Sequence, residues 1–425
     1  MIWLILGYVY LCIHRPFEIW PALGDMRIEL VYFTTMCAVW FAAPKRLRSP
    51  ALLMAVGGMA TAFLLSWLLS PWAERAEPVV KNFALVVVFA LIMATALRDE
   101  KQVYRVLTMF LVVMGLYMLH SVWEYKNGRH TYRMSIARLI GVDLTLGDPN
   151  SFGASIVYSL PFLTFFWHHY GRGAKRIVLC GGYLLLSVGC VLLTGSRSSL
   201  LGVVLWGVTL LLQTRQKLLA VMGLGVLACA SWFVLPESLQ NRFETIIDPS
   251  KGPANAQESG QGRIEGYVTG LKLWSEYPVS GCGPLAWRPA SGSKIESHTL
   301  YGQVMGEMGT AGVLAFGALV SALGLNLRKV AKLTKPGTGV VEDRSLFHLA
   351  RAMQVSLFLL LFEGLFGHNL YRYNWSWYCA FTAVALGVCK ARLAMPSPSE
   401  DDEFDDEDDG DEATEWHYSM ASTAA

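Results

Sequence analysis

The sequence has few charged residues for its length. Only 16% of the 425 residues are Asp, Glu, Lys or Arg, whereas 53% are hydrophobic and the mean hydropathy is +0.38. Soluble globular domains carry about 25% charged residues. This composition excludes an ordinary soluble domain, and the apolar residues gather in runs long enough to cross a hydrocarbon core. We therefore expect an all-α polytopic membrane protein.

Sequence motifs that mark several enzyme classes are missing. The chain has no glycine-rich nucleotide-binding loop, no residues at metal-ligand spacing and no Ser-His-Asp arrangement. Among its eight cysteines, only Cys282 lies in the long polar loop at 236–297, so this loop contains no internal disulfide. We expect no cofactor, no metal ion and no nucleic acid partner.

Long apolar runs recur along the whole chain. They lie at 2–13, 28–43, 51–70, 79–97, 103–123, 151–167, 177–193, 198–213, 217–235, 299–327, 345–367 and 374–391. Because about 20 apolar residues cross the hydrocarbon core, these runs predict about twelve transmembrane helices. The first two runs are short, so one bent span in their place, and about eleven helices in all, is the alternative.

Linkers rich in Lys and Arg alternate with linkers that are poor in them. The basic linkers contain Lys45, Arg46 and Arg48; Arg98, Lys101 and Arg105; Arg172, Lys175 and Arg176; Arg215 and Lys217; and Arg328, Lys329, Lys332 and Lys335. Each lies two apolar runs after the previous one, as the positive-inside rule requires of cytoplasmic loops. Both termini are therefore predicted to be cytoplasmic, with the loops 124–150 and 236–298 on the external face.

The predicted organisation has four parts: helices at 1–235, the long external loop at 236–298, the last helices at 299–392 and an acidic tail at 393–425. Within the loop, Gly, Pro and Ser favour a flexible stretch at 248–262. An amphipathic helix is predicted at 263–277, ended by Pro278. The segment Ser397–Glu412 is almost entirely Asp and Glu, which favours a disordered tail.

Arginine is frequent on the predicted external face. The residues are Arg129, Arg133, Arg138, Arg197, Arg263 and Arg288. A guanidinium offers a planar fork of donors that matches phosphate oxygens, so arginines gathered at the headgroup level favour a phosphate or diphosphate ligand. Contact with anionic lipid or with loop carboxylates is the alternative, and it is the better interpretation of Arg129, Arg133 and Arg138 taken singly. Arg197 begins an apolar run among small residues, which favours a functional role.

His298 stands where the long loop ends and an apolar run begins. An imidazole with an ordinary pKa near 6.5 is suited to take a proton from a hydroxyl group at neutral pH. A helix-capping or interfacial histidine is the alternative. Further candidates to line a site with His298 are Arg288, Arg138, Asn150 and His368.

Other polar and small residues favour structural roles. Asp148 precedes an apolar run and is expected to cap a helix. The glycines at 302, 306, 309 and 312 form a small-residue face that favours close helix packing. Glu307 lies about 13 Å along the helix from His298, so we expect it to pair with a polar group rather than to act in catalysis.

These residues together resemble the O-antigen ligase and polymerase superfamily of bacterial polysaccharide assembly. The matching pieces are Asp148-Pro149-Asn150, Thr194-Gly195-Ser196-Arg197, Arg263-Ile264 leading to Tyr277–Pro284, and His298 followed by Gly306–Gly312. They keep the order of the family and span most of 148–312. The sequence departs from the family pattern at Thr299, where asparagine often follows the histidine.

The resemblance implies a metal-independent, inverting glycosyltransferase in the bacterial inner membrane. Such an enzyme moves a glycan from undecaprenyl diphosphate to a hydroxyl group of a glycan, glycolipid or protein acceptor. It implies that His298 is the catalytic residue and that Arg197 and Arg263 bind the diphosphate. A repeat-unit polymerase and a protein O-oligosaccharyltransferase share these motifs and remain alternatives to a ligase. A transporter of bicarbonate or of a lipid-linked sugar is the alternative from another class, although transporters usually place ionisable residues at the membrane midplane and contain an internal repeat.

Overall fold

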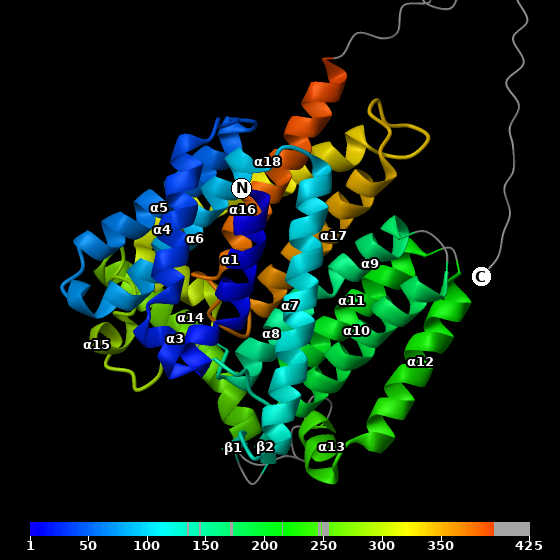
Figure 1. Cartoon of the computed structure of the whole chain (residues 1–425). Coiled ribbons are helices and arrows are strands. Elements are labelled where there is room, and N and C mark those ends of the chain that lie inside the picture. Colours follow the sequence, from blue (N-terminus) through cyan, green and yellow to red (C-terminus); the bar gives the residue numbers. More distant parts are fainter. Residues whose placement is uncertain are drawn as a thin grey trace, which may run out of the picture.

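The protein is a bundle of α-helices with one small hairpin (Figure 1). The computed structural model describes residues 1–133, 136–143, 146–170, 173–214, 216–244, 248 and 255–394. Arg172, Arg215 and the acidic segment from Ser397 onward therefore lie outside the described residues, as does most of the stretch at 248–254.

The elements follow one another as helices with short connections. They are α1 (Ile2–His14), α2 (Pro16–Ile19), α3 (Pro21–Asp25), α4 (Ile28–Ala42), α5 (Pro50–Leu68), the 3-10 helix η1 (Ala73–Ala76), α6 (Glu77–Ala96), α7 (Glu100–Lys126), β1 (Thr131–Arg133), β2 (Ile136–Arg138), α8 (Pro149–Ser159), α9 (Pro161–His169), α10 (Ala174–Thr194), α11 (Arg197–Gln213), α12 (Lys217–Val234), α13 (Glu237–Glu244), α14 (Asn255–Glu276), α15 (Trp287–Ser291), α16 (Leu300–Leu333), α17 (Arg344–Glu363) and α18 (Tyr373–Leu393). The hairpin pairs β1 with β2 antiparallel, with Tyr132 opposite Ala137.

The apolar runs of the sequence coincide with these helices. Among the described residues, 7 helices are long and apolar enough to cross a membrane, and α4 and α11 are shorter apolar helices. The run at 151–167 is divided into α8 and α9, because Pro161 lacks the N–H that would continue one helix. The all-α membrane fold is therefore as expected, while the count of about twelve spans remains a prediction.

The two ends of the bundle carry different segments. In Figure 1 the N-terminus and the end of α18 lie at one end, and the hairpin β1–β2 and α13 lie at the other. This arrangement agrees with a common side for both termini. Its assignment to the cytoplasm rests on the alternation of basic linkers and remains a prediction.

Helix α16 stands at the centre of the packing. It contacts α5, α14, α17 and α18, and its buried face includes Leu300, Val304, Leu319 and Leu323. Helix α14 lies along its first turns so closely that a Cβ at Gly270 would be 2.7 Å from the Cα of Gly302. The glycine face therefore packs against a neighbouring helix, as the sequence predicts.

Helix α16 is interrupted at Gly309, whose φ of 59° and ψ of −154° are non-helical. Only glycine adopts this conformation readily. The break frees main-chain groups that would otherwise bond within the helix, and the segment 278–283 binds them. The hydrogen bonds run from Cys282 N–H to Gly306 O (2.9 Å), from Gly283 N–H to Glu307 O (3.1 Å), from Thr310 N–H to Pro278 O (2.9 Å) and from Ala311 N–H to Val279 O (3.0 Å).

This junction has no space for larger residues. A Cβ at Gly281 would lie 2.2 Å from the carbonyl carbon of Glu307, and a Cβ at Gly309 would lie 2.5 Å from the nitrogen of Gly281. On its other side the segment meets the turn after α5, where Ser70 Oγ donates to Cys282 O at 2.6 Å. The motif pieces 277–284 and 306–312 are thus two halves of one backbone junction.

Two expectations about the long loop need correction. Helix α14 begins at Asn255, earlier than the predicted start at Arg263, and therefore includes part of the stretch expected to be flexible. The segment 278–283 pairs with α16 about 13 Å beyond the start of that helix, and its residues Gly281–Gly283 are buried there. Cys282 within it is fully buried.

Candidate functional site

Arg197 lies at a tight turn between two helices. Helix α10 ends at Gly195, whose φ of 59° is left-handed and favours glycine. Ser196 then caps α11, and Arg197 is the first residue of that helix. Helix α8 packs so closely that a Cβ at Gly153 would lie 2.6 Å from Ser199 Oγ. The small residues of the motif thus allow three helices to meet directly below the Arg197 guanidinium.

Arg263 approaches Arg197 from α14. Burial lowers the pKa of the Arg263 guanidinium, and the positive charge of Arg197 lowers it further, whereas Glu363 opposes both effects. The Arg263 guanidinium also lies over the ring of Phe366, 4.8 Å from its centre. Two arginines held close enough to repel each other form a place where an anion would be stabilised.

Glu363 ends α17, is only 3% exposed and is close enough to Arg263 for its charge to act on that guanidinium. Its side chain is hydrogen-bonded to Ser198, while its Oε1 accepts no hydrogen bond from the residues that the structure describes. Gly202 leaves room for this carboxyl group, because a Cβ there would lie 2.7 Å from Oε1. Glu363 is therefore a buried carboxyl group near Arg263 that the sequence reading did not single out.

His298 is exposed between two fully buried neighbours, Ser297 and Thr299. Thr299 caps α16, since its Oγ1 accepts a hydrogen bond from Gly302 N–H at 3.0 Å. The helix-capping role is thus filled by Thr299 and not by His298. Asparagine is an equally good capping residue, so threonine at this position conserves the physical role of the residue common in the family.

His368 lies beside His298. Its Nδ1 donates a hydrogen bond to the main-chain oxygen of Ser297 at 2.9 Å. The protein around the ring lowers the pKa of His368, and the charges of Arg372 and His298 lower it further. The structure therefore brings His298 and His368 together, as the sequence suggested for these two residues.

Arg372 is a site residue that the sequence reading missed. It follows the turn after α17, and its Nη1 donates to Ser155 Oγ of α8 at 2.6 Å. Its effect on His368 places its charge next to the histidine pair. The signal was present in the sequence, because the positive-inside rule makes an arginine unusual in a short external turn.

Arg138 and Asn150 are adjacent but do not line an open site. Arg138 is 1% exposed, and it donates to Thr194 O at 2.6 Å and to Asn150 Oδ1 at 2.9 Å. Asp148 caps α8 as expected, accepting from Ser151 N–H at 2.8 Å. Arg138 therefore connects the hairpin with α8 and with the end of α10. These two hydrogen bonds help to hold the turn before Arg197 in position.

Arg288 and Glu307 are held by other partners. Arg288 Nε forms an ion pair with Glu296 Oε1 at 3.0 Å. Glu307 is 1% exposed and accepts hydrogen bonds from Tyr371 at 2.5 Å and from Gln303 at 3.2 Å. The polar partners expected for Glu307 are present, and Arg288 forms its ion pair within its own loop.

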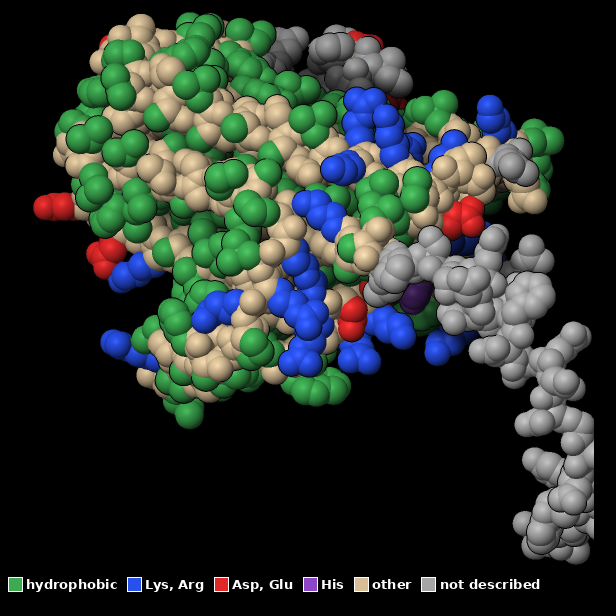
Figure 2. All heavy atoms as spheres, turned by 90° about the horizontal axis from the view of Figure 1, so that it is seen from above, with side chains coloured by type: hydrophobic (Ala, Val, Ile, Leu, Met, Phe, Trp, Pro, Cys, Tyr) green, Lys and Arg blue, Asp and Glu red, His purple; other side chains and the backbone are tan. Residues whose placement is uncertain are grey.

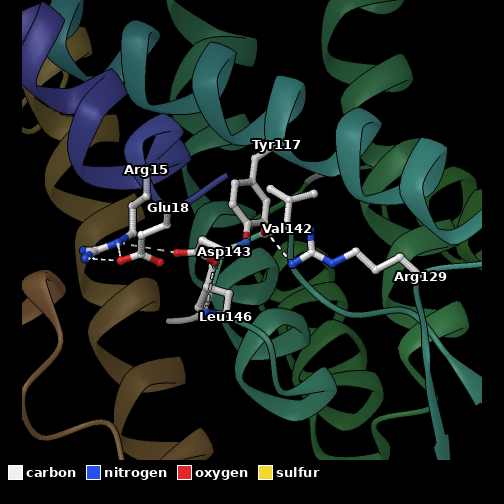
Figure 3. Close-up of polar contacts among 7 residues, drawn as sticks. All are labelled: Arg15, Glu18, Tyr117, Arg129, Val142, Asp143 and Leu146. Carbon is white, nitrogen blue, oxygen red and sulfur yellow. Dashed lines mark hydrogen bonds and ion pairs between the residues drawn. The ribbon is translucent and has the colours of Figure 1, made fainter. Parts of the chain in front are cut away.

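A second polar cluster stabilises the loop 124–150 (Figure 3). Asp143 accepts hydrogen bonds from Tyr117 and from Leu146 N–H, and Arg15 lies 3.8 Å from its Oδ2. Arg129 donates to Val142 O at 2.7 Å. Its Nη1 also lies 4.0 Å from Glu124 Oε2. Arg129 therefore has its partners within its own loop, which agrees with the loop-carboxylate interpretation of the sequence.

Part of the geometry just described lies within the region that a family comparison identifies. The family model described as O-antigen ligase matches residues 182–317. This region belongs to the O-antigen ligase superfamily. The match contains Arg197, Arg263, His298 and both halves of the backbone junction, and it confirms the resemblance seen in the sequence. A comparison with curated proteins found no match.

The family and the helices together give the class of the protein. It is a membrane protein whose relatives by family are ligases and polymerases that use lipid-linked glycans. Among the described residues, no group of three or more His, Cys, Asp or Glu side chains is arranged to hold a metal ion. The ionisable groups of the site are instead arginines, histidines and one buried glutamate.

Proposed function

We propose that this protein is an O-antigen ligase-like glycosyltransferase. It transfers a glycan from undecaprenyl diphosphate to an acceptor hydroxyl, such as one on the lipid A core, at the external face of the bacterial inner membrane. The observation that carries the proposal is that α14 adjoins both Arg197 and His298 inside the region matched by the family. Arg263 on this helix is close enough to Arg197 to be affected by its charge, and a Cβ at the preceding residue, Gly262, would lie 3.9 Å from the ring of His298.

The arginine pair accounts for the donor end of the reaction. The anomeric C–O bond to the diphosphate breaks, and the electron pair leaves with the diphosphate. Negative charge therefore grows on the leaving oxygen in the transition state, where Arg197 and Arg263 stabilise it. Their mutual repulsion favours occupation of the site by an anion, since a diphosphate between them removes that repulsion.

The histidine accounts for the acceptor end. The acceptor oxygen attacks the anomeric carbon from the side opposite the diphosphate, which inverts that centre. His298 takes the proton of the attacking hydroxyl, so the new C–O bond forms without an oxonium product. His368 fixes the main chain at Ser297, one residue before His298, and the charge of Arg372 acts on His368.

The test is product formation from a synthetic undecaprenyl diphosphate-linked glycan and a lipid A core acceptor, using purified protein. We expect the glycan on the acceptor with the opposite anomeric configuration, and an equal rate with and without a chelator. Retention of configuration, or loss of activity on chelation, would refute the single-displacement mechanism. Transport of the donor without any glycosidic product would place the protein in the transporter class.

A further inference from the structure

A large cavity lies away from the proposed transfer site. It has a volume of about 860 Å³ and is bordered by α9, α10, α11, α16 and α17. Its lining includes the far end of α16 and the start of α17, so it opens toward the end of the bundle that carries the N-terminus and the end of α18 (Figure 1). The His298 site is at the opposite end of α16.

The mouth of the cavity is strongly basic. Arg328 and Lys332 are four residues apart on α16, Lys335 follows directly after the end of that helix, and Arg351 joins them from α17. These four side chains are exposed, and no Asp or Glu is among the described residues that line the cavity. Figure 2, which looks onto this end of the molecule, shows Lys and Arg side chains gathered on its surface.

The inner part of the cavity is apolar. Leu163, Leu184, Leu210, Trp206 and Phe347 form its walls. Trp206 lies seven residues before Gln213 at the mouth, which places it about 10 Å deeper along α11. The cavity thus changes from cationic at the membrane surface to apolar toward the middle of the bundle.

One polar atom points to a ligand inside. Trp206 is only 3% exposed, yet its Nε1 has no hydrogen-bond partner among the residues that the structure describes. A buried donor without an acceptor costs about 1–3 kcal/mol, so an oxygen atom of a bound molecule is the expected partner. An ester carbonyl between a headgroup and its acyl chains lies at the right depth to accept this bond.

We propose that this cavity binds one anionic phospholipid. The phosphate lies between Arg328, Lys332 and Lys335, an ester oxygen accepts from Trp206, and the acyl chains lie against the leucines. Basic pockets between transmembrane helices commonly bind such headgroups. The acidic segment Ser397–Glu412 is another anion on the same chain, but carboxylates placed against Leu, Trp and Phe would lose their hydration without compensation.

The proposal is tested by native mass spectrometry of the purified full chain in detergent. The probes are dioleoyl phosphatidylglycerol and dioleoyl phosphatidylcholine, which differ in headgroup charge but not in acyl chains. We expect one phosphatidylglycerol retained in preference to phosphatidylcholine. Each cation contributes about fivefold to binding, so Arg328→Gln, Lys332→Gln and Lys335→Gln together should weaken it at least tenfold. Lys329→Gln is the matched control, because Lys329 is on the same helix but does not line the cavity.

A second pair of variants leaves the charge unchanged. Gly181 lines the cavity and a Cβ there meets no atom within 4 Å, so Gly181→Leu fills space without a clash. Gly182→Leu is its control, since Gly182 has the same open surroundings but does not line the cavity. We expect loss of bound lipid with Gly181→Leu only.

Three results would overturn the proposal. The first is equal retention of the two phospholipids by the wild-type protein. The second is unchanged phosphatidylglycerol binding in both the triple variant and Gly181→Leu. The third is phosphatidylglycerol binding only after deletion of residues 397–425, which would make the acidic tail the occupant.

Discussion

His368 Nδ1 donates its proton to the carbonyl oxygen of Ser297, so the neutral ring presents Nε2 as its only basic nitrogen. The same bond holds the main chain one residue before His298. A contact between the turn after α17 and the end of the long loop thus sets the position of the proposed base. This relationship makes His368 a positioning residue whose role can be separated from that of His298.

Replacing His298 removes the proposed base directly. General-base catalysis contributes about 10²–10⁴-fold, so we expect His298→Ala to lower the transfer rate by about that factor while donor binding persists. The measurement is initial rate together with donor affinity. His130→Ala is the control, because His130 is a histidine of the other loop on the same predicted face and packs against Tyr132. Wild-type activity in His298→Ala would disprove the mechanism.

Replacing His368 tests positioning. A lost hydrogen bond of about 0.5–1.5 kcal/mol predicts a fall in kcat of about two- to tenfold for His368→Leu, with little change in KM. His368→Gln retains an N–H donor and should recover much of the loss. If the glutamine variant were as slow as the leucine variant, the bond to Ser297 would not be the relevant contact.

The lowered pKa of His368 also predicts a pH effect on stability. Above about pH 6.5 the histidine is neutral in both folded and unfolded chains. As the pH falls below this value, the unfolded chain takes up a proton more readily than the folded one, so stability decreases until the lower folded pKa is passed. Between about pH 6.5 and 5, the wild-type Tm should therefore fall more than that of His368→Gln. Parallel Tm curves for the two proteins would contradict this assignment.

The diphosphate contact is tested by a change that keeps charge. Lysine cannot reproduce the planar donor fork, so Arg197→Lys should raise the donor Kd by about tenfold or more, given about 1.5–3 kcal/mol for a charged hydrogen bond. Arg288→Lys is the matched control, since Arg288 is paired with Glu296. Equal donor binding by wild type and Arg197→Lys would remove Arg197 from the phosphate site.

The backbone junction predicts a position-specific stability effect. Gly309→Ala forces a side chain into a positive-φ conformation 2.5 Å from Gly281 N, and should destabilise the protein by about 2–5 kcal/mol. Gly317→Ala is the control on the same helix, because a Cβ there meets no atom within 4 Å. Thermal unfolding measures both variants. A Gly309→Ala protein as stable as the control would show that the break in α16 is not required.

Membrane sidedness is tested with single cysteines in a chain freed of native cysteines. Lys294 and Thr338 are exposed on loops at opposite ends of α16. In intact cells an impermeant thiol reagent should label Lys294→Cys and not Thr338→Cys. The reverse pattern would place the proposed transfer site on the wrong side of the membrane.

The sequence predicted the helices well because their signal is local. Apolar runs coincide with the long helices outside the loop 236–298 closely enough that Arg197, at a run's edge, was correctly placed at a helix start. The burial of Arg138 could not be predicted, since it depends on Thr194 and Asn150 meeting across three elements. Arg372 was overlooked although an arginine in a short external turn is a signal in the sequence, but its contact with Ser155 of α8 could not be predicted.

The interruption of α16 has a consequence for the assembly of the protein at the membrane. A helix with free carbonyls at Gly306 and Glu307 and free amides at Thr310 and Ala311 is costly to place alone in hydrocarbon, where each unsatisfied group costs several kcal/mol. The segment that satisfies them precedes α16 in the chain and is synthesised first. We therefore expect the translocation machinery to release α16 into lipid together with residues 277–284 as one hairpin, rather than as a separate helix.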